Sequence, residues 1–222
     1  MISIEAQRNL FIEISNRLQK EIVVYAIGGT AMMFLGLKEA TKDIDLVFTD
    51  KDDRKAFKEI AKSLGYKEMD SVIVYGVRDN MPEMINLGDS RLDLFLLDVI
   101  DFTFSSSMQK RAEQIHQFGK NLIIKIADKH DIILMKCATS RTKDEDDAVN
   151  IVRNSDINWD ILIEEARVQE NLGKEMVFLE MGSLIEKLIH KHKLKIPKRV
   201  GDDLFRLLRK QIDSKKKRHN KK

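Results

Sequence analysis

The chain has 222 residues, of which 43% are hydrophobic and 34% are charged, with one cysteine and two prolines. Such a composition excludes a chain that is disordered throughout and any intramolecular disulfide, and it allows one domain or two small ones. The lone Cys137 fits a reducing compartment, so we expect a cytoplasmic protein. The uncharged stretch 22–37 is too short for a membrane helix, and we expect no membrane partner.

Positive charge is concentrated near the C-terminus, although the formal net charge is only +3. Residues 191–222 contain 14 Lys and Arg against 3 Asp and Glu, whereas residues 1–190 contain 25 against 33. We expect the lysine-rich segment 214–222 to be a disordered tail, which either stays solvated or contacts nucleic acid. The acidic balance of residues 1–190 argues against extensive RNA contact outside that tail.

The first hundred residues alternate between helical periodicity and short apolar runs that are typical of buried strands. In chain order they predict a helix at 4–19, a strand at 22–27, a helix at 30–37, a strand at 43–48, a helix at 50–66, a strand at 72–77, a strand and turn at 83–90, and a strand at 91–100. Thr30 is placed to cap the second helix at its N-terminus. We therefore expect an α+β fold, in which helices flank a mixed sheet of about four or five strands.

Helical patterns dominate after residue 105. The second half predicts a helix at 106–118, a short strand at 121–126, and helices at about 127–139, 144–154, 159–170, 174–192 and 199–213. We therefore divide the chain into an α/β core at 1–104, a helical C-terminal domain at 105–213 packed on that core, and the basic tail at 214–222. No flexible linker separates the first two domains in the sequence.

Two aspartates, Asp43 and Asp45, interrupt an otherwise apolar strand. Side chains at i and i+2 share one face of a strand, so these two carboxylates project together and repel each other. Either basic side chains neutralise them, or they jointly bind a hard divalent cation such as Mg²⁺. A metal site would favour a third acid, and the strand at 91–100 offers Asp93 and Asp98 on opposite faces. We favour Asp93, because Asp98 approaches the end of the strand, where an acid is easily solvated.

Three acids on adjacent strands can hold two Mg²⁺ ions, about 3.5–4 Å apart, for displacement at a triphosphate. A glycine pair, Gly28-Gly29, precedes the aspartates and joins the strand at 22–27 to the next helix. Such a turn exposes backbone N–H groups at a helix N-terminus, where phosphate can bind, and Thr30 adds a hydroxyl. A glycine pair alone is weak evidence, since most such pairs are ordinary turns or tight packing.

These residues resemble the signature of the DNA polymerase beta-like nucleotidyltransferase superfamily, in which a glycine pair precedes Asp-x-Asp in a strand and a third acid on a later strand. Here twelve residues separate Thr30 from Asp43. The segment GGTAMMFLGLKEATKDIDLVF (28–48) is most similar to the compact prokaryotic branch that includes the AbiEii-type abortive-infection toxins. That branch often reads G-G-x-A, then G-x-R-x-T-x-D-x-D. In this chain Lys38 stands near the usual arginine, and one extra residue precedes Thr41.

The resemblance extends into the helical half, through ADKHDIILMKCATSRTKDEDDAVNIV (127–152). Lys136 matches a lysine on one helix of that branch, Lys143-Asp144 matches a following Lys-Asp pair, and Asp147 matches the second acid. In the branch, this lysine and a downstream acid are implicated in nucleotide binding or catalysis. From the residues alone, Lys136 and Asp144 lie on inward helix faces, so they either pair with each other or serve a bound triphosphate.

The resemblance implies a Mg²⁺-dependent nucleotidyltransferase, with Mn²⁺ as a second metal, that moves a nucleoside monophosphate from an NTP such as ATP to a hydroxyl. It implies catalytic roles for Asp43, Asp45, Asp93 and Lys136, metal binding by the three aspartates, and nucleotide binding by Gly28, Gly29, Thr30, Lys136 and Asp144. The expected acceptor is an RNA or tRNA 3′ end, followed by a protein hydroxyl and then a small molecule. A toxin-type enzyme would also have an antitoxin partner. The alternative is a non-catalytic nucleic-acid-binding or antitoxin-like module that retains the fold.

Overall fold

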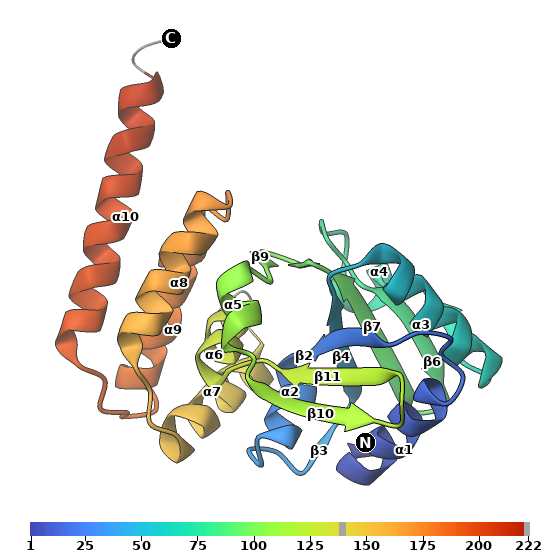
Figure 1. The fold of residues 1–222 in the computed structure, drawn as a ribbon. Coiled ribbons are helices and arrows are strands. Elements are labelled where there is room, and N and C mark those ends of the chain that lie inside the picture. Colours follow the sequence, from blue (N-terminus) through green and yellow to red (C-terminus); the bar gives the residue numbers. More distant parts are fainter. Residues whose placement is uncertain (138–140, 220–222) are drawn as a thin grey trace. The chain divides into compact units, whose positions relative to one another are not determined.

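The computed structural model describes residues 1–137 and 141–219 (Figure 1). Contacts divide the chain into two compact units, Met1–Ile132 and Ile133–Lys222, and the division falls inside helix α6. The first unit holds a mixed sheet and the second is helical, so the expected α+β fold with a helical C-terminal half is confirmed. The core and domain limits expected from the sequence, with a boundary after residue 104, stay predictions.

The described residues form eleven strands and ten helices. The strands are β1 (Ile2–Ser3), β2 (Ile22–Ala26), β3 (Ala40–Thr41), β4 (Asp43–Phe48), β5 (Lys67–Met69), β6 (Glu83–Leu87), β7 (Ser90–Leu96), β8 (Asp98–Val99), β9 (Phe102–Thr103), β10 (Gln114–Phe118) and β11 (Leu122–Ile126). The helices are α1 (Ile4–Ser15), α2 (Gly28–Phe34), α3 (Lys51–Ser63), α4 (Val72–Tyr75), α5 (Ser106–Arg111), α6 (Lys129–Lys136), α7 (Thr142–Asn154), α8 (Trp159–Asn171), α9 (Val177–His190) and α10 (Lys198–His219).

The main sheet of the first unit has the strand order β10-β11-β2-β4-β7-β6-β5, and β8 and β9 extend it beside β7. Strand β4 lies in its middle, antiparallel to β2 and parallel to β7. Four of the six residues of β4 are buried, and the two half-buried ones are Asp43 and Asp45. The sheet has nine strands, so the expectation of four or five was too low. Several of the additional strands are only two or three residues long and carry no apolar pattern.

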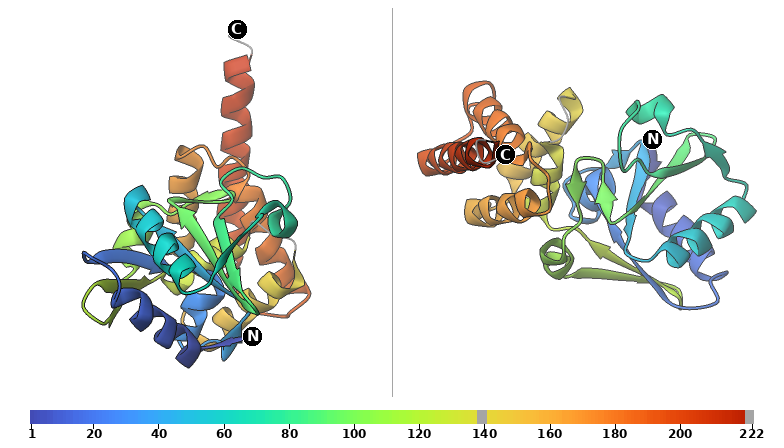
Figure 2. Two further views of the ribbon diagram at one scale, coloured as in Figure 1. Left: turned by 90° about the vertical axis from the view of Figure 1, so that its right-hand side faces the viewer. Right: turned by 90° about the horizontal axis from the view of Figure 1, so that it is seen from above.

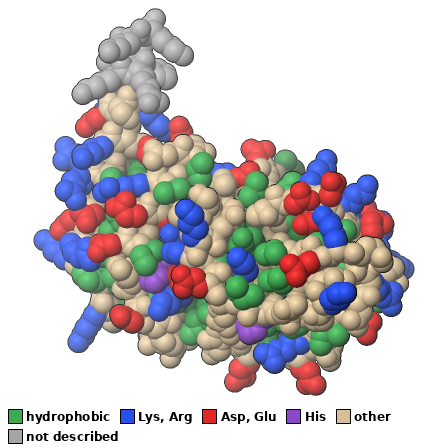
Figure 3. Space-filling model, in the orientation of Figure 1, with side chains coloured by type: hydrophobic (Ala, Val, Ile, Leu, Met, Phe, Trp, Pro, Cys, Tyr) green, Lys and Arg blue, Asp and Glu red, His purple; other side chains and the backbone are tan. Residues whose placement is uncertain are grey.

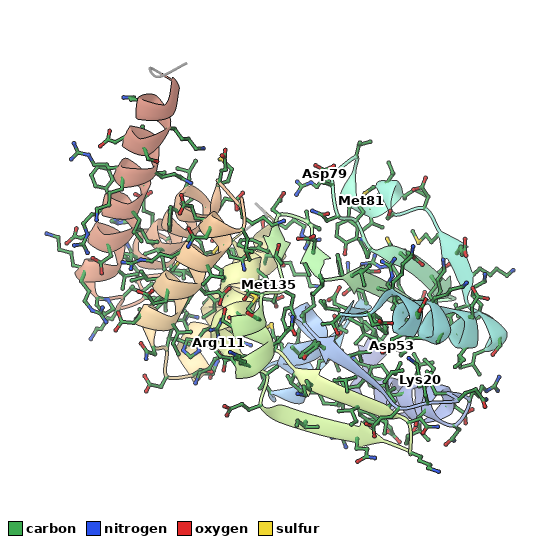
Figure 4. The ribbon with its side chains drawn as sticks, turned by 45° about the horizontal axis from the view of Figure 1, so that its top comes forward. Lys20, Asp53, Asp79, Met81, Arg111 and Met135 are labelled. Atoms are coloured by element: carbon green, nitrogen blue, oxygen red, sulfur yellow. The ribbon has the colours of Figure 1, made fainter. Side chains whose placement is uncertain are left out.

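Helices α1 and α3 pack on this sheet, α1 against β10 and β11 and α3 against β4 and β7. Both begin at side-chain caps, because the Ser3 hydroxyl and the Asp50 carboxylate accept hydrogen bonds from N–H groups of the first helical turn. Phe57 of α3 is fully buried against the sheet. Lys20, which follows α1, pairs with Asp53 in the first turn of α3 at 2.6 Å (Figure 4). The caps and buried faces together fix both helices on the sheet, and α3 packs on the two strands that carry the acids.

Residues 72–75 form the short helix α4, so the strand predicted at 72–77 is wrong. The Asp70 carboxylate accepts a hydrogen bond from the Val72 N–H at 2.9 Å, which favours a turn over an extended chain. Gly76 ends the helix with a φ of 69°, a conformation that glycine adopts without steric cost. The β-rich composition of this segment is therefore overridden by local capping and by the contacts that Tyr75 makes in the sheet.

Two other elements are shorter than the sequence predicted. Strand β7 ends at Leu96 and does not continue to residue 100, because Leu97 adopts a φ of 56° and donates its N–H to the Phe48 carbonyl at 2.9 Å. The helix predicted at 106–118 is present only in its first part, as α5. Its second part is strand β10, which pairs antiparallel with β11 along its whole length. A hydrogen bond to a residue distant in sequence decides the first conformation, and pairing with the next strand of a hairpin decides the second.

The second unit consists of helices that pack on one another. Helix α9 contacts α7, α8 and α10, and α10 also contacts α8 (Figure 2). Each contributes an apolar face to a common core, including Leu162, Met181 and Leu204. Lys and Arg side chains gather on the described part of α10, with Asp among them (Figure 3). No helix in the described part of the chain is long and apolar enough to cross a membrane.

Two sequence expectations fall partly outside the described residues. The helix predicted at 127–139 corresponds to α6 as far as Lys136, and residues 138–139 are not described. Helix α10 reaches His219, into the segment 214–222 that we expected to be a disordered tail. Residues 220–222 lie outside the described range, and the tail stays a prediction.

Candidate active site

Three acids meet on the neighbouring strands β4 and β7. In their parallel register Asp45 lies directly opposite Asp93, and Asp43 lies opposite Arg91. Strand alternation puts all four side chains on one face of the sheet. One carboxylate oxygen from each of Asp43, Asp45 and Asp93 lies within 4.8 Å of the others. The structure therefore brings together the three aspartates that the sequence suggested as metal ligands.

The competing third acid, Asp98, has a different environment. It begins β8, after the turn at Leu97, and its carboxylate accepts a hydrogen bond from the Thr103 hydroxyl at 2.5 Å. The turn separates it from the strand that carries Asp93, so the cluster with Asp43 and Asp45 contains Asp93.

Arg91 is the residue that the sequence interpretation missed. Its Nε donates to Asp93 Oδ1 at 2.9 Å, and its Nη2 donates to Asp93 Oδ2 at 3.0 Å and also to Asp43 Oδ2. One guanidinium thus joins two carboxylates from two strands. The sequence offered a signal, since Arg91 stands two residues before Asp93 and so shares its face of the strand. Only the register between β4 and β7 reveals that Asp43 lies opposite.

Tyr75 reaches the same carboxylate from α4. Its hydroxyl donates to Asp93 Oδ2 at 2.6 Å. Burial raises the pKa of Tyr75 far above its ordinary value, and the nearby charges of Asp45 and Asp93 raise it further, so the hydroxyl stays protonated as a donor. No sequence signal predicted this contact, because it depends on the helical turn that replaces the expected strand.

Burial dominates the electrostatics of Asp93. Its side chain is completely buried, whereas the side chains of Asp43 and Arg91 retain 18% and 21% exposure. Burial raises the pKa of Asp93 above its usual range, while the Arg91 guanidinium and the Tyr75 hydroxyl act in the opposite direction by stabilising the carboxylate. Arg91 is held in its charged form, because the surrounding carboxylates outweigh the effect of burial on its pKa.

The glycine pair lies against the acids with almost no free space. Gly28 has a φ of 55°, and a Cβ at that position would stand 2.7 Å from Asp45 Oδ2. A Cβ on Gly29 would stand 2.5 Å from the Thr41 hydroxyl oxygen. A Cβ at either position would therefore force a neighbouring side chain to shift, and at Gly28 the left-handed backbone adds a second reason for glycine. The backbone at the start of α2 is thereby held beside the carboxylate cluster.

Thr30 does not cap α2, so that prediction is wrong. The helix begins at Gly28, with Ile27 at the N-cap position. Thr30 is fully buried, and its hydroxyl accepts a hydrogen bond from the Asp45 N–H at 2.9 Å and donates to the Asp43 carbonyl at 3.5 Å. The hydroxyl thus ties α2 to the backbone of β4 at the residues that carry the acids.

Lys136 and Asp144 form an ion pair within the second unit. The Lys136 ammonium donates to Asp144 at 2.5 Å and to Asp147 at 2.8 Å, and Arg141 donates to Asp144 at 2.7 Å. Burial alone would lower the pKa of Lys136, but the two carboxylates raise it above its ordinary value. The structure therefore brings these predicted residues together as a buried charge cluster. A part for them in nucleotide binding stays a prediction.

The chemistry of the first cluster suits a hard divalent cation. Its donors are three carboxylates, which are the ligands that Mg²⁺ and Mn²⁺ prefer. Arg91 supplies one positive charge against three negative ones, so these four side chains together remain negative when all three acids are ionised. The oxygens are already convergent, and a cation would lower their mutual repulsion. The residues present therefore fit a divalent metal.

Residues 1–177 match the sequence model of a family described as "Nucleotidyltransferase of unknown function (DUF6036)". The match covers more than half of the chain and includes both Asp-bearing strands and the Lys136 cluster. The chain belongs to this nucleotidyltransferase family. Nucleotidyl transfer, which the resemblance implied, is thereby confirmed at the level of the family. No curated protein matches the chain.

Membership of the nucleotidyltransferase family bears on which ligand the acidic cluster binds. Such a family implies a nucleoside triphosphate as substrate and a divalent metal, and the convergent carboxylates are the group in the described residues that fits the metal. The closer likeness to AbiEii-type toxins stays a prediction, because the family is described only as a nucleotidyltransferase of unknown function.

Proposed function

We propose that this protein is a Mg²⁺-dependent enzyme that transfers a nucleoside monophosphate from an NTP to a hydroxyl and releases pyrophosphate, with Mn²⁺ able to replace Mg²⁺. The observation that carries the proposal is the convergence of three carboxylates on β4 and β7 beside the glycine turn. When bound, the divalent ion supplies positive charge that stabilises the triphosphate and the reacting oxygens.

The residues of this chain would bind the metal, accept the proton and bind the phosphates. Asp43 and Asp45 would hold the metal, and Asp93 would complete its ligand set and accept the proton of the acceptor hydroxyl. The backbone of Gly28, Gly29 and Thr30 would bind the phosphates through N–H groups that a first helical turn leaves without intrahelical partners.

Lys136 and Asp144 enter the proposal through the resemblance to the compact prokaryotic branch. Lys136 would act as a point charge on the triphosphate, and Asp144 would orient its ammonium through the 2.5 Å contact between them. The pairing in the structure supports the orienting part of this role. A purely structural ion pair predicts instead that both residues affect stability and leave nucleotide affinity unchanged.

For the acceptor we propose the 3′ end of an RNA such as tRNA. The support is the basic C-terminal region, where residues 191–222 hold 14 Lys and Arg against 3 Asp and Glu. A protein hydroxyl is the second candidate and a small molecule the third. The resemblance to abortive-infection toxins further suggests a toxin-type role with an antitoxin partner.

One observation favours a second candidate function. Arg91 already neutralises part of the acidic cluster, as a charge network without catalytic use would require. In that reading the chain is a nucleic-acid-binding or antitoxin-like module that retains a nucleotidyltransferase fold. The two functions differ in whether loss of the acids changes nucleotide handling.

The deciding experiment measures transfer of label from each NTP to total RNA, cell protein or small hydroxyl compounds, with Mg²⁺ or Mn²⁺. The Asp43→Asn and Asp45→Asn variants should lose both transfer and metal-dependent NTP binding. Asp98→Asn, outside the cluster, should retain them. Absence of label in every pool, with NTP binding unaffected by the first two variants, would refute the enzymatic function and leave the binding module.

A further inference from the structure

The carboxylate oxygens that a metal would need are already engaged by Arg91 and Tyr75. Asp93 Oδ1 accepts from Arg91 Nε, and Asp93 Oδ2 accepts from both Arg91 Nη2 and the Tyr75 hydroxyl. The same Arg91 Nη2 also donates to Asp43 Oδ2. A single guanidinium therefore bridges two of the three acids of the cluster.

A guanidinium in this place conflicts with a divalent ion. The guanidinium and the divalent ion are both cations that bind the same carboxylate oxygens, and two cations in contact with one pair of carboxylates repel each other. Arg91 stays charged whatever its surroundings, so it cannot relieve the conflict by losing a proton. It can relieve it by moving, because its side chain is long and keeps 21% exposure, which gives the guanidinium a route to solvent.

We infer that Arg91 is a built-in counter-ion that occupies the acidic cluster in the metal-free protein and leaves Asp43 and Asp93 when a divalent ion binds. The inference rests on the metal site of the proposed function and goes beyond it. Arg91 acts here as a positioning residue. It keeps mutually repelling carboxylates assembled before the ion arrives, and its departure lowers the net affinity for the ion.

The hydrogen bond from Tyr75 to Asp93 is kept throughout the exchange. The Tyr75 hydroxyl is neutral and contacts only one oxygen of Asp93, so it does not compete as a cation. When Arg91 leaves, Tyr75 still holds the buried Asp93 carboxylate in its present orientation. The freed guanidinium remains attached to β7 beside the cluster, where it can meet a phosphate oxygen.

The test measures binding of Mn²⁺ alone to the full chain by calorimetry and electron paramagnetic resonance. The informative variants are Arg91→Met, which removes the charge, and Arg91→Lys, which keeps it without the bidentate fork. The matched control is Arg78→Met, because Arg78 forms an ion pair with Asp101 at 3.3 Å at the surface of the same unit.

Arg91→Met should bind Mn²⁺ about tenfold or more tightly than the unaltered protein, because the ion no longer has to displace a charge-assisted hydrogen-bonded pair. Arg91→Lys should fall between the two, and Arg78→Met should match the unaltered protein. The Arg91→Met protein without metal should unfold at a lower temperature, and Mn²⁺ should raise its unfolding temperature by a larger increment than in the unaltered protein. Unchanged or weaker Mn²⁺ binding in Arg91→Met would overturn the inference, since it would mean that Arg91 supports the bound metal.

Two measurements keep this result distinct from the proposed function. If Asp45→Asn abolishes Mn²⁺ binding while Arg91→Met leaves it unchanged, the metal site stands and only the exchange fails. If neither the unaltered protein nor Arg91→Met binds Mn²⁺, both proposals fall.

If Arg91→Met does not fold, nitrogen-15 NMR of the unaltered protein decides the question. A slowly exchanging arginine Nε–H signal that is missing in Arg91→Lys should lose its protection when Mg²⁺ is added. Its persistence at saturating Mg²⁺ would overturn the exchange.

Discussion

Substitution of Gly28 by alanine tests how closely the glycine turn and the acids depend on each other. At a φ of 55° the left-handed backbone destabilises the folded alanine variant by about 1–2 kcal/mol. The lower conformational entropy of its unfolded chain offsets roughly 0.4–1 kcal/mol of this loss. The new Cβ would also stand 2.7 Å from Asp45 Oδ2, and overpacking of this kind costs about 1–3 kcal/mol. The free energy of unfolding should therefore fall by about 1–4.5 kcal/mol.

Gly88 provides a matched control in the same unit. Its φ is 57°, and no atom lies within 4 Å of a Cβ built there. Gly88→Ala should therefore cost only the backbone part, about 1.5 kcal/mol or less. The difference between the two variants isolates the contact with Asp45.

Urea denaturation measures both losses, and calorimetry with Mn²⁺ measures the effect on the site. Gly28→Ala should weaken Mn²⁺ binding, because Asp45 must move to make room, whereas Gly88→Ala should leave it unchanged. The reasoning is refuted if Gly28→Ala loses no more stability than Gly88→Ala and binds Mn²⁺ as the unaltered protein does.

Three other predictions follow from single contacts. Tyr75→Phe leaves a buried carboxylate without one donor and should lower the free energy of unfolding by about 1–3 kcal/mol, measured by urea denaturation; no loss would show that water replaces the hydroxyl. Lys136→Met removes the buried cation that Asp144 and Asp147 share and leaves Asp144 with only Arg141, so it should cost about 3–5 kcal/mol; a second change, Asp144→Asn, should restore part of this loss, and strictly additive losses would contradict the pairing. Lys191 holds the pKa of Glu145 below its ordinary value of 4.5, so this pair stabilises the protein above about pH 4.5 and loses that contribution as the pH falls further. The stability difference between Glu145→Gln and the unaltered protein should therefore shrink between pH 7 and pH 3, and a constant difference would refute the assignment.

Features decided by local chemistry were predictable from the sequence. The strand at 43–48 was predicted with its observed limits, because an apolar run interrupted only by Asp43 and Asp45 has no other periodicity. The helix after Asp50 was equally clear, since its cap, acidic first turn and terminal glycine agree with one another. Strand alternation put Asp93 and Asp98 on opposite faces, and the choice of Asp93 rested on its place in the middle of the predicted strand.

Features decided by contacts with other elements of the fold were not predictable in the same way. The segment 72–77 has the composition of a strand, yet it forms a helical turn that delivers the Tyr75 hydroxyl to Asp93. Gln114–Phe118 continues a helical pattern, yet it pairs with β11. Thr30 looked like a cap, but its hydroxyl bonds to the backbone of β4, thirteen residues or more away. Each outcome depends on a partner whose position the local sequence does not contain.

The cation that balances the acids shows how the two kinds of information combine. From the sequence, Asp43 and Asp45 required either a basic side chain or a divalent metal, and these were separate alternatives. The structure supplies the basic side chain as Arg91, and the family supplies the reason to expect the metal. Under the proposed exchange both alternatives hold, one before the metal binds and one after. Without a cation the three carboxylates would repel one another, and the guanidinium holds them together until the metal arrives. The metal affinity then reflects the difference in free energy between the cluster neutralised by the metal and the cluster neutralised by Arg91. Removal of Arg91 should therefore strengthen metal binding, whereas removal of an aspartate should abolish it.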